Sequence, residues 1–187
     1  MSMADENQIL LEQPELGKTI RRMAHEIIEK CPEPNALVLI GIRSRGVHLA
    51  RRLARNIEEI DKSTPPVAAI DVSRFRDDRV DAQAGSVVGA FEIDASVDDK
   101  TIVLIDDVIY RGRTIRAAME AVERLGQPKR ILVAALIDRG ERELPIRADI
   151  VGKNIDAVEG QRVNVRLVEA DGVDQVMLVD WRGRSGN

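Results

Sequence analysis

The 187-residue sequence contains very few aromatic residues and few side chains that bind transition metals. It has four aromatic side chains, one cysteine (Cys31) and two histidines (His25 and His48). A single cysteine excludes an internal disulfide, and two histidines far apart in sequence give no zinc or other transition-metal cluster. No apolar run approaches the ~18 residues that span a bilayer, and the acidic, polar start is unlike a secretory leader. We therefore expect a cytoplasmic protein without a membrane segment.

Aliphatic side chains must build the core. The chain has 20 valines, 19 isoleucines and 14 leucines, and this β-branched excess favours a sheet wrapped by helices over a helical bundle. The length suits a single domain of ~100–200 residues. Because the sequence contains no repeat, low-complexity segment or linker, we predict one domain over residues 1–187.

The charges are unevenly distributed along the chain. The net charge of −4 argues against a protein that binds nucleic acid over its whole surface. Residues 21–55 carry eight lysines and arginines against three acids, whereas residues 77–99 carry seven acids against one arginine. A basic stretch is most often a solvated helix face, so a nucleic-acid surface here needs support from another observation.

Hydrophobic spacing predicts alternating strands and helices. Apolar residues three or four apart indicate helices from 14 to about 30, from 47 to the STPP stretch at 63–66, and from about 113 to 125. Short apolar runs predict strands at 36–42, 67–72, 101–106 and 130–137, with two late candidates around 162–169 and 175–181. This order predicts an α/β fold with a mainly parallel central sheet and ligands beyond the carboxyl ends of its strands. The acid-rich stretch 74–99 is expected to be a long mobile arm.

The segment 101–115, TIVLIDDVIYRGRTI, carries the most chemical information. A buried strand is followed by Asp106 and Asp107, and a turn with Gly112 leads into a helix that begins near Arg113. Amides of such a turn and helix start, together with the helix dipole, favour a phosphate. Two carboxylates suit sugar hydroxyls and Mg²⁺, so the pattern points to a ribose 5-phosphate. The alternative is that the acids only cap the strand and the helix.

The stretch VLIDDVIYRGRT at 103–114 resembles the phosphoribosyl diphosphate (PRPP) signature of type I phosphoribosyltransferases. Three more stretches, MAHEIIE at 23–29, FRDD at 75–78 and RELPIRADIVGKN at 142–154, narrow the resemblance to the PyrR family over nearly the whole chain. Members of that family attenuate pyrimidine operons and are uracil phosphoribosyltransferases. The resemblance implies the type I phosphoribosyltransferase fold, with a small hood from about 138–187 and a flexible catalytic arm at about 74–99.

The resemblance also assigns roles to matching positions. Asp106 and Asp107 would bind the ribose hydroxyls and, directly or through water and PRPP, Mg²⁺. The implied catalytic residues are Asp106, Asp107, Arg43 and Arg76. The 5′-phosphate loop would comprise Val108, Ile109, Tyr110, Arg111, Gly112, Arg113 and Thr114. The diphosphate loop would comprise Ile42, Arg43, Ser44, Arg45 and Gly46, whose arginines offer forked donors to phosphate oxygens. The base-binding positions would be Ile137, Asp138 and Arg139.

The second implied function is binding of a stem-loop in pyrimidine leader mRNA, strengthened by UMP or UTP. The matching positions are His25, Arg142, Arg147 and Lys153, and such side chains can contact phosphates or stack on unpaired bases. The alternatives are an ion pair of Arg147 with Asp149 or Glu143, and a half-buried core position for His25. The resemblance also implies a homo-oligomer, a dimer or a tetramer.

Two residues depart from the family pattern. Arg111 replaces a small hydroxyl residue in the 5′-phosphate loop, and Glu141 stands where the family usually has histidine. We expect weaker handling of PRPP or UMP from the first and repulsion of phosphate from the second. Three other functions stay open: a nucleotide-sensing RNA regulator with little turnover, a purine phosphoribosyltransferase, and an unrelated doubly wound nucleotide-binding protein.

Overall fold

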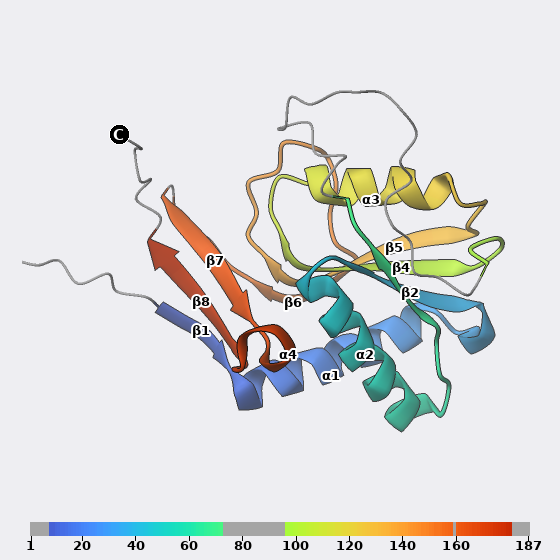
Figure 1. Cartoon of the computed structure of the whole chain (residues 1–187), viewed down its shortest axis with the longest axis horizontal. Coiled ribbons are helices and arrows are strands. Elements are labelled where there is room, and N and C mark those ends of the chain that lie inside the picture. The colour runs from blue at the N-terminus through green and yellow to red at the C-terminus, as the bar shows by residue number, and fades with distance from the viewer. Residues whose placement is uncertain (1–7, 73–95, 159, 181–187) are drawn as a thin grey trace, which may run out of the picture.

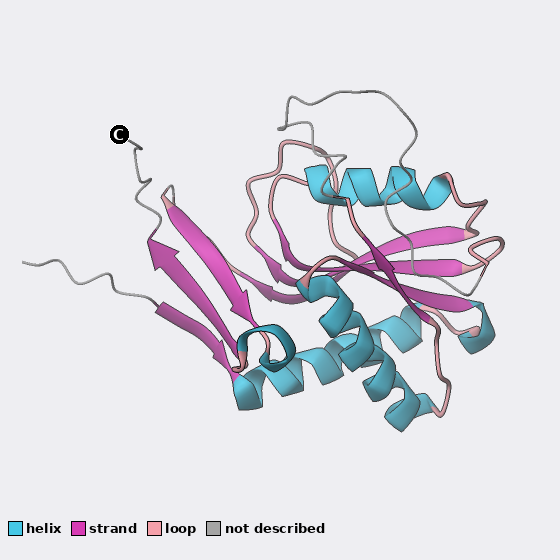
Figure 2. Ribbon diagram, in the orientation of Figure 1, coloured by secondary structure: helices cyan, strands magenta, loops and turns pink. Residues whose placement is uncertain are grey.

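A central sheet of five parallel strands forms the framework of the protein (Figures 1 and 2). The computed structural model describes residues 8–72, 96–158 and 160–180. The strand order is β3-β2-β4-β5-β6, and every pairing in it is parallel. The strands are β2 (Leu37–Ile42), β3 (Val67–Ile70), β4 (Thr101–Ile109), β5 (Arg130–Asp138) and β6 (Ile150–Asn154). The predicted α/β class and mainly parallel sheet are confirmed.

Helices cover both faces of this sheet because its strands are apolar on both sides. Helices α1 (Gln13–Lys30) and α2 (Arg45–Asp61) lie on one face, and α3 (Arg113–Glu123) lies on the other, as Figure 1 shows. Leu39 of β2 packs with the α1 and α2 side chains, whereas its neighbour Ile40 packs with those of α3. A short 3₁₀ helix, Pro34–Ala36, precedes β2. No helix of the described residues is long and apolar enough to cross a membrane.

A second, antiparallel sheet forms the hood, and both ends of the described chain contribute to it. Its order is β1-β8-β7, from β1 (Gln8–Glu12), β8 (Gln175–Asp180) and β7 (Gln161–Arg166), and helix α4 (Val168–Asp171) joins β7 to β8. The sequence did not predict β1 or β6. β6 belongs to the central sheet although it lies in the range expected to build the hood, and β1 joins the hood from the opposite end of the sequence.

Two further expectations need correction. Strand β4 does not stop at Asp106 but continues to Ile109. Its pairing with β5 extends to the residue pair Ile109 and Asp138. Of the expected mobile arm at 74–99, residues 74–95, with Arg76, lie outside the described residues. Residues 96–99, the last part of that stretch, pack against the rest of the protein. Val97 is buried in the core, and Asp98 Oδ1 accepts a 2.7 Å hydrogen bond from the Gln127 amide.

Arginines of helix α2 attach the hood to the central sheet. Arg52 donates from Nε to Glu169 Oε1 at 2.9 Å and from its two terminal nitrogens to Asp174 at 2.9 and 2.7 Å. The hydrogen bond from Arg52 lowers the pKa of Glu169. Burial alone would raise the pKa of Asp174, but hydrogen bonds from Arg52 and the Val168 amide outweigh it and lower that pKa. Both carboxylates therefore stabilise the folded state as anions.

We expect Arg52→Leu to lower the free energy of unfolding at pH 7 by about 2 kcal/mol, between the values of exposed and fully buried ion pairs. The folded-state pKa values of Glu169 and Asp174 are depressed, so their contribution is present above the unfolded-state pKa of ~4 and is lost as the pH falls through the folded-state values. The difference between wild type and variant should therefore shrink toward pH 3. Urea unfolding at pH 7 and near pH 3 measures it. Arg51→Leu, at an exposed neighbour, is the control, and a pH-independent difference would contradict the assignment.

Candidate active site

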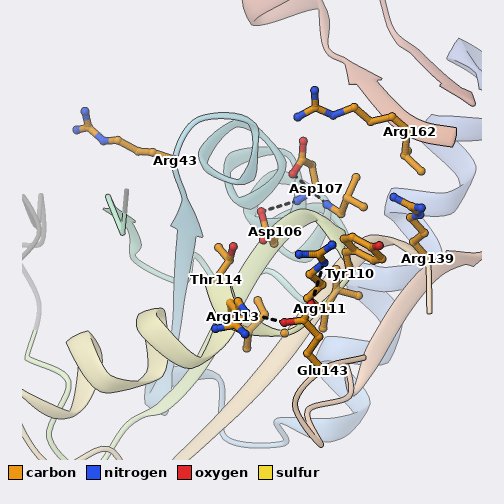
Figure 3. A pocket seen from close by; sticks show the side chains of 15 residues that line it. Arg43, Asp106, Asp107, Tyr110, Arg111, Arg113, Thr114, Arg139, Glu143 and Arg162 are labelled. Atoms are coloured by element: carbon orange, nitrogen blue, oxygen red, sulfur yellow. Dashed lines mark hydrogen bonds and ion pairs between the residues drawn. The ribbon is translucent and has the colours of Figure 1, made fainter. Parts of the chain in front are cut away.

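The acid pair lies near the carboxyl end of the central strand β4, at the floor of a cavity of about 540 Å³. Asp106 is buried and Asp107 is half-buried. One oxygen of each is held by the next main-chain amide: Asp107 N–H donates to Asp106 Oδ1 at 3.0 Å, and Val108 N–H donates to Asp107 Oδ1 at 2.9 Å. Neither caps helix α3, whose N-cap is Gly112 without a side-chain cap. The helix-capping part of that alternative is therefore wrong, whereas each acid does bind a main-chain amide of its own strand. Both carboxylates also line the cavity (Figure 3).

The turn between β4 and α3 forms the cradle, which we define as residues 110–114. Gly112 has φ +90°, a left-handed conformation that disfavours any residue with a Cβ. The first turn of α3 follows at once, and the side chains of Leu144 and Ile146 pack beneath Gly112. All five cradle residues line the cavity. An anion in it would meet main-chain amides at the positive end of the helix dipole, as the sequence predicted.

Of the positions expected to bind the diphosphate, only Arg43 lines the cavity. Figure 3 shows its side chain extending away from the acid pair. Ile42 and Gly46 are buried, and Ser44 is exposed. Arg45 instead holds the hood, since its Nη2 lies 2.8 Å from Asp171 Oδ1. This contact raises the pKa of Arg45 and, together with the Leu167 amide, lowers the pKa of Asp171.

The base-binding positions meet at the paired ends of β4 and β5. Arg139 stacks on Tyr110, with its guanidinium carbon 4.1 Å from the ring centroid, and both residues line the cavity. Arg139 Nε is buried, and among the described residues no hydrogen-bond partner reaches it. Ile137 is fully buried, and Asp138 Oδ2 accepts a 2.7 Å bond from Arg142. Glu141, which stands where the family usually has histidine, lies with its Oε2 3.5 Å from Arg139 Nη2. It therefore brings an acid beside the cavity.

Four cavity residues lie outside the predicted site: Ile115, next to the cradle, and three residues from distant parts of the chain. Glu143 pairs with Arg111 and Arg113 of the cradle at 3.1 and 2.7 Å, and Arg162 and Val163 enter from hood strand β7 (Figure 3). Only the three-dimensional fold brings the three distant residues together: Glu143 is 30 residues from Arg113 along the chain, and β7 reaches the site through a separate sheet. No local pattern could have identified them.

Comparison with known proteins identifies the family. The phosphoribosyl transferase domain model matches residues 6–169. A protein of Pelotomaculum thermopropionicum named bifunctional protein PyrR is 48% identical over 178 residues, covering 95% of this chain and 98% of that protein. A bifunctional protein PyrR of Chloroflexus aurantiacus is 46% identical over 177 residues, covering 95% and 97%. The chain belongs to the PyrR family of phosphoribosyltransferases.

Solved structures agree with this family at the level of the fold. A hypoxanthine phosphoribosyltransferase of Trypanosoma cruzi superposes with a TM-score of 0.73 at 17% identity, covering 94% of this chain and 97% of that one. A hypoxanthine-guanine phosphoribosyltransferase of Bacillus anthracis gives 0.68 at 19% identity, covering 96% and 99%. Identities this low establish the phosphoribosyltransferase fold alone, whereas the PyrR relatives share nearly half of their residues. The unrelated doubly wound protein is excluded.

The four positions expected to bind RNA in a PyrR protein differ in their surroundings. His25 on α1 is exposed, so a half-buried core position for it is wrong. Arg147 is also exposed, and neither expected ion pair forms: Glu143 binds the cradle arginines, and Asp149 Oδ2 accepts from the Val133 amide at 2.9 Å. Lys153 Nζ donates to Leu10 O at 3.0 Å. The guanidinium of Arg142 is fully engaged within the protein, with bonds to the oxygens of Tyr110, Gly140, Ile146 and Asp138.

The acid pair fits the Mg²⁺ that phosphoribosyltransferases generally use with PRPP. Among the described residues no group of three or more possible metal ligands occurs, so the protein offers two carboxylates and no closed cage. Mg²⁺ commonly keeps several waters and binds through one or two carboxylates plus substrate phosphates. Asp106 and Asp107, which share a cavity with the cradle, match that pattern.

Proposed function

We propose that this protein transfers the phosphoribosyl group of PRPP to uracil, forming UMP and diphosphate, and that it regulates pyrimidine genes by binding leader mRNA when UMP or UTP is bound. One observation carries the enzymatic part: the acid pair and the cradle share one cavity in a chain that belongs to the PyrR family. We further propose that residues 1–187 act as one phosphoribosyltransferase domain, in the cytoplasm, as a homodimer or homotetramer.

The proposed reaction depends on positioning and charge more than on proton transfer. The 5′-phosphate occupies the cradle, and Asp106 and Asp107 accept hydrogen bonds from the ribose hydroxyls, which fixes the anomeric carbon. As the bond to diphosphate breaks, positive charge develops on the sugar, and the nearby carboxylates stabilise it. Bound Mg²⁺ would neutralise charge on the leaving diphosphate. Arg43, beyond the end of β2, lines the cavity, and in the proposed mechanism its side chain would turn toward the leaving diphosphate.

Arg139 and Tyr110 support the proposed base site. A buried donor without a partner is costly unless a ligand satisfies it, and Arg139 Nε is such a donor at the cavity. A carbonyl oxygen is the acceptor that uracil presents. The stack with Tyr110 holds the guanidinium at 4.1 Å, so the donor keeps its place when the base is absent.

Turnover with different bases tests the proposal directly. Purified protein is incubated with PRPP and Mg²⁺, and the formation of UMP and diphosphate is measured with uracil, with hypoxanthine, guanine and orotate in parallel. We expect turnover with uracil alone. Turnover with hypoxanthine or guanine in preference to uracil would favour the purine enzyme. Saturable UMP binding without turnover would favour the nucleotide-sensing regulator, an alternative that Arg111 and Glu141 keep open because both change the charge near the phosphate.

The proposed RNA surface combines helix α1 with strand β6 and the loop before it. Arg22 of α1 donates from Nη2 to Val151 O at 3.0 Å, so the helix lies against β6. His25 is one helical turn further along the same helix. Arg147 belongs to the loop that enters β6, and it is exposed. His25 on α1 lies across the sheet from α3 (Figure 1), whereas Arg147 belongs to a loop whose residues Ile146 and Ala148 pack on the α3 side of the core. The proposed surface therefore extends around β6, the edge strand of the sheet.

We expect Arg147→Ala to weaken binding of a pyrimidine leader stem-loop several-fold, because an exposed arginine that meets a phosphate contributes through counterion release. The slope of log K against log salt concentration should fall by ~0.7. Filter binding between 50 and 200 mM salt, with saturating UMP, measures both quantities. Arg124→Ala, which removes an exposed arginine that follows α3 and pairs with Glu120, is the matched control. Equal losses in the two variants would show that only net charge matters and would contradict this surface.

A further inference from the structure

Glu143 places a carboxylate directly against the cations of the cradle. Its Oε1 lies 3.1 Å from Arg111 Nε, and its Oε2 lies 2.7 Å from Arg113 Nε. All three residues line the same cavity as the acid pair, and in Figure 3 Glu143 approaches the two arginines from the far side of the cradle. The two guanidinium groups next to Gly112 therefore already face an anion that belongs to the protein.

The main chain holds this carboxylate in position. The amides of Glu143 and Leu144 both donate to Arg111 O, at 3.1 and 3.2 Å. The neighbouring Arg142 donates to Tyr110 O at 2.8 Å and to Asp138 Oδ2 at 2.7 Å. Glu143 is thus fixed beside the cradle by its own backbone and by the residue before it, and its contact with the arginines does not depend on a freely moving loop.

A 5′-phosphate and the Glu143 carboxylate use the same donors. Both are oxyanions that accept charge-assisted bonds from guanidinium groups, and a nucleotide phosphate carries the larger negative charge at pH 7. We propose that Glu143 is an internal competitor of the ligand's 5′-phosphate: it occupies Arg111 and Arg113 in the free protein, it lowers the affinity of the cradle, and the phosphate displaces it. This inference rests on the proposed function, which supplies PRPP or UMP as the occupant.

Because residue 111 is an arginine in this chain, Glu143 competes for two guanidinium groups and not for one. A small hydroxyl residue at that position would leave Glu143 with Arg113 alone, whereas here the carboxylate bridges two cations. The added cation and the bridging acid offset each other, so the cradle gains less attraction for phosphate than Arg111 alone would provide. Glu143 is therefore an affinity-setting residue of the phosphate site.

Titration calorimetry with UMP tests the inference. Glu143→Gln keeps the shape and removes the charge, and we expect it to bind UMP about three- to tenfold more tightly than wild type at low salt, the range of two partly exposed ion pairs. The gain should shrink as salt screens the arginines. It should also be smaller in an Arg111→Thr background, where only one of the two contested guanidinium groups remains. Glu143→Asp, which keeps the charge on a shorter side chain, should fall between wild type and Glu143→Gln.

Glu120→Gln is the matched control, because Glu120 pairs with Arg124 on α3 and does not line the cavity. It should leave the UMP affinity unchanged. Unchanged or weaker UMP binding by folded Glu143→Gln would overturn the competition, and so would an equal gain from Glu120→Gln, which would show a general charge effect. Failure of the wild-type protein to bind UMP at all would overturn the proposed function itself, and the two failures are therefore distinguishable.

Discussion

Replacing Asp107 with asparagine is expected to lower kcat/KM for UMP formation by about 10²–10³-fold, the loss typical of removing one preorganised electrostatic group from an active site. The amide keeps the size of the side chain and an oxygen that can accept from the Val108 amide, which now binds Asp107 Oδ1 at 2.9 Å. It loses the negative charge that, in the proposed mechanism, holds the ribose hydroxyls and faces the cationic transition state. Steady-state kinetics with uracil and PRPP measures the loss.

The same chain provides a matched control for this change. Asp61 lies at the last residue of α2, is exposed, and accepts a hydrogen bond only from the nearby Ser63 among the described residues. Asp61→Asn therefore makes the same chemical change far from the cavity and should retain full activity. If Asp107→Asn retained more than about a tenth of wild-type kcat/KM while binding PRPP normally, the acid pair would not be the ribose site.

Gly46→Ala should destabilise the protein strongly although it adds only one methyl group. A Cβ at Gly46 would lie 2.4 Å from Ile105 O, and that carbonyl is main chain in the central strand, so neither side can yield without moving α2 away from β4. Overpacking of this kind costs ~1–3 kcal/mol and sometimes more; we expect about 3 kcal/mol or more here. Because Asp106 follows Ile105 directly, uracil phosphoribosyltransferase activity should fall together with the free energy of unfolding.

Gly17→Ala is the opposite case and the natural comparison. Gly17 is exposed in the middle of α1, and nothing lies within 4 Å of the position its Cβ would take. Alanine there should stabilise the protein by ~0.5–1 kcal/mol through helix propensity. Urea unfolding of both variants measures the contrast. A Gly46→Ala protein as stable as wild type would mean that the close approach of α2 to β4 is not required.

The elements that the sequence predicted are those whose signal is local. Strand β2 and the first half of β4 are continuous apolar runs, and the α1 stripe of Leu16, Ile20 and Ile27 is buried as its spacing indicated. The acid pair was found for the same reason, since it directly follows apolar residues of a buried strand. Family resemblance then supplied the roles that local patterns do not define.

The elements that were missed depend on contacts between distant segments. Strand β1 ends at Glu12 and α1 begins at Gln13 without a turn between them. Pro14 marks the start of the helix, but no local signal marks the five residues before it as a strand. Strand β6 contains Gly152, where a Cβ would lie 2.4 Å from Leu136 O; its place in the sheet follows from close backbone approach and not from an apolar pattern. Likewise the partner of Arg45 is Asp171, which no spacing rule connects to it.

The pairing of the two hood ends has a consequence for biosynthesis. Leu11 in β1 aligns with Val176 in β8, so β1 leaves the ribosome long before the strand with which it pairs and cannot join the hood sheet until β8 is made. The strands of the parallel sheet end with β6 at Asn154, and they can assemble earlier with a smaller loop-closure penalty. The cavity floor with its acid pair thus forms on the nascent chain before the wall that carries Arg162, and during this interval the unpaired edge of β1 is open to association with other chains.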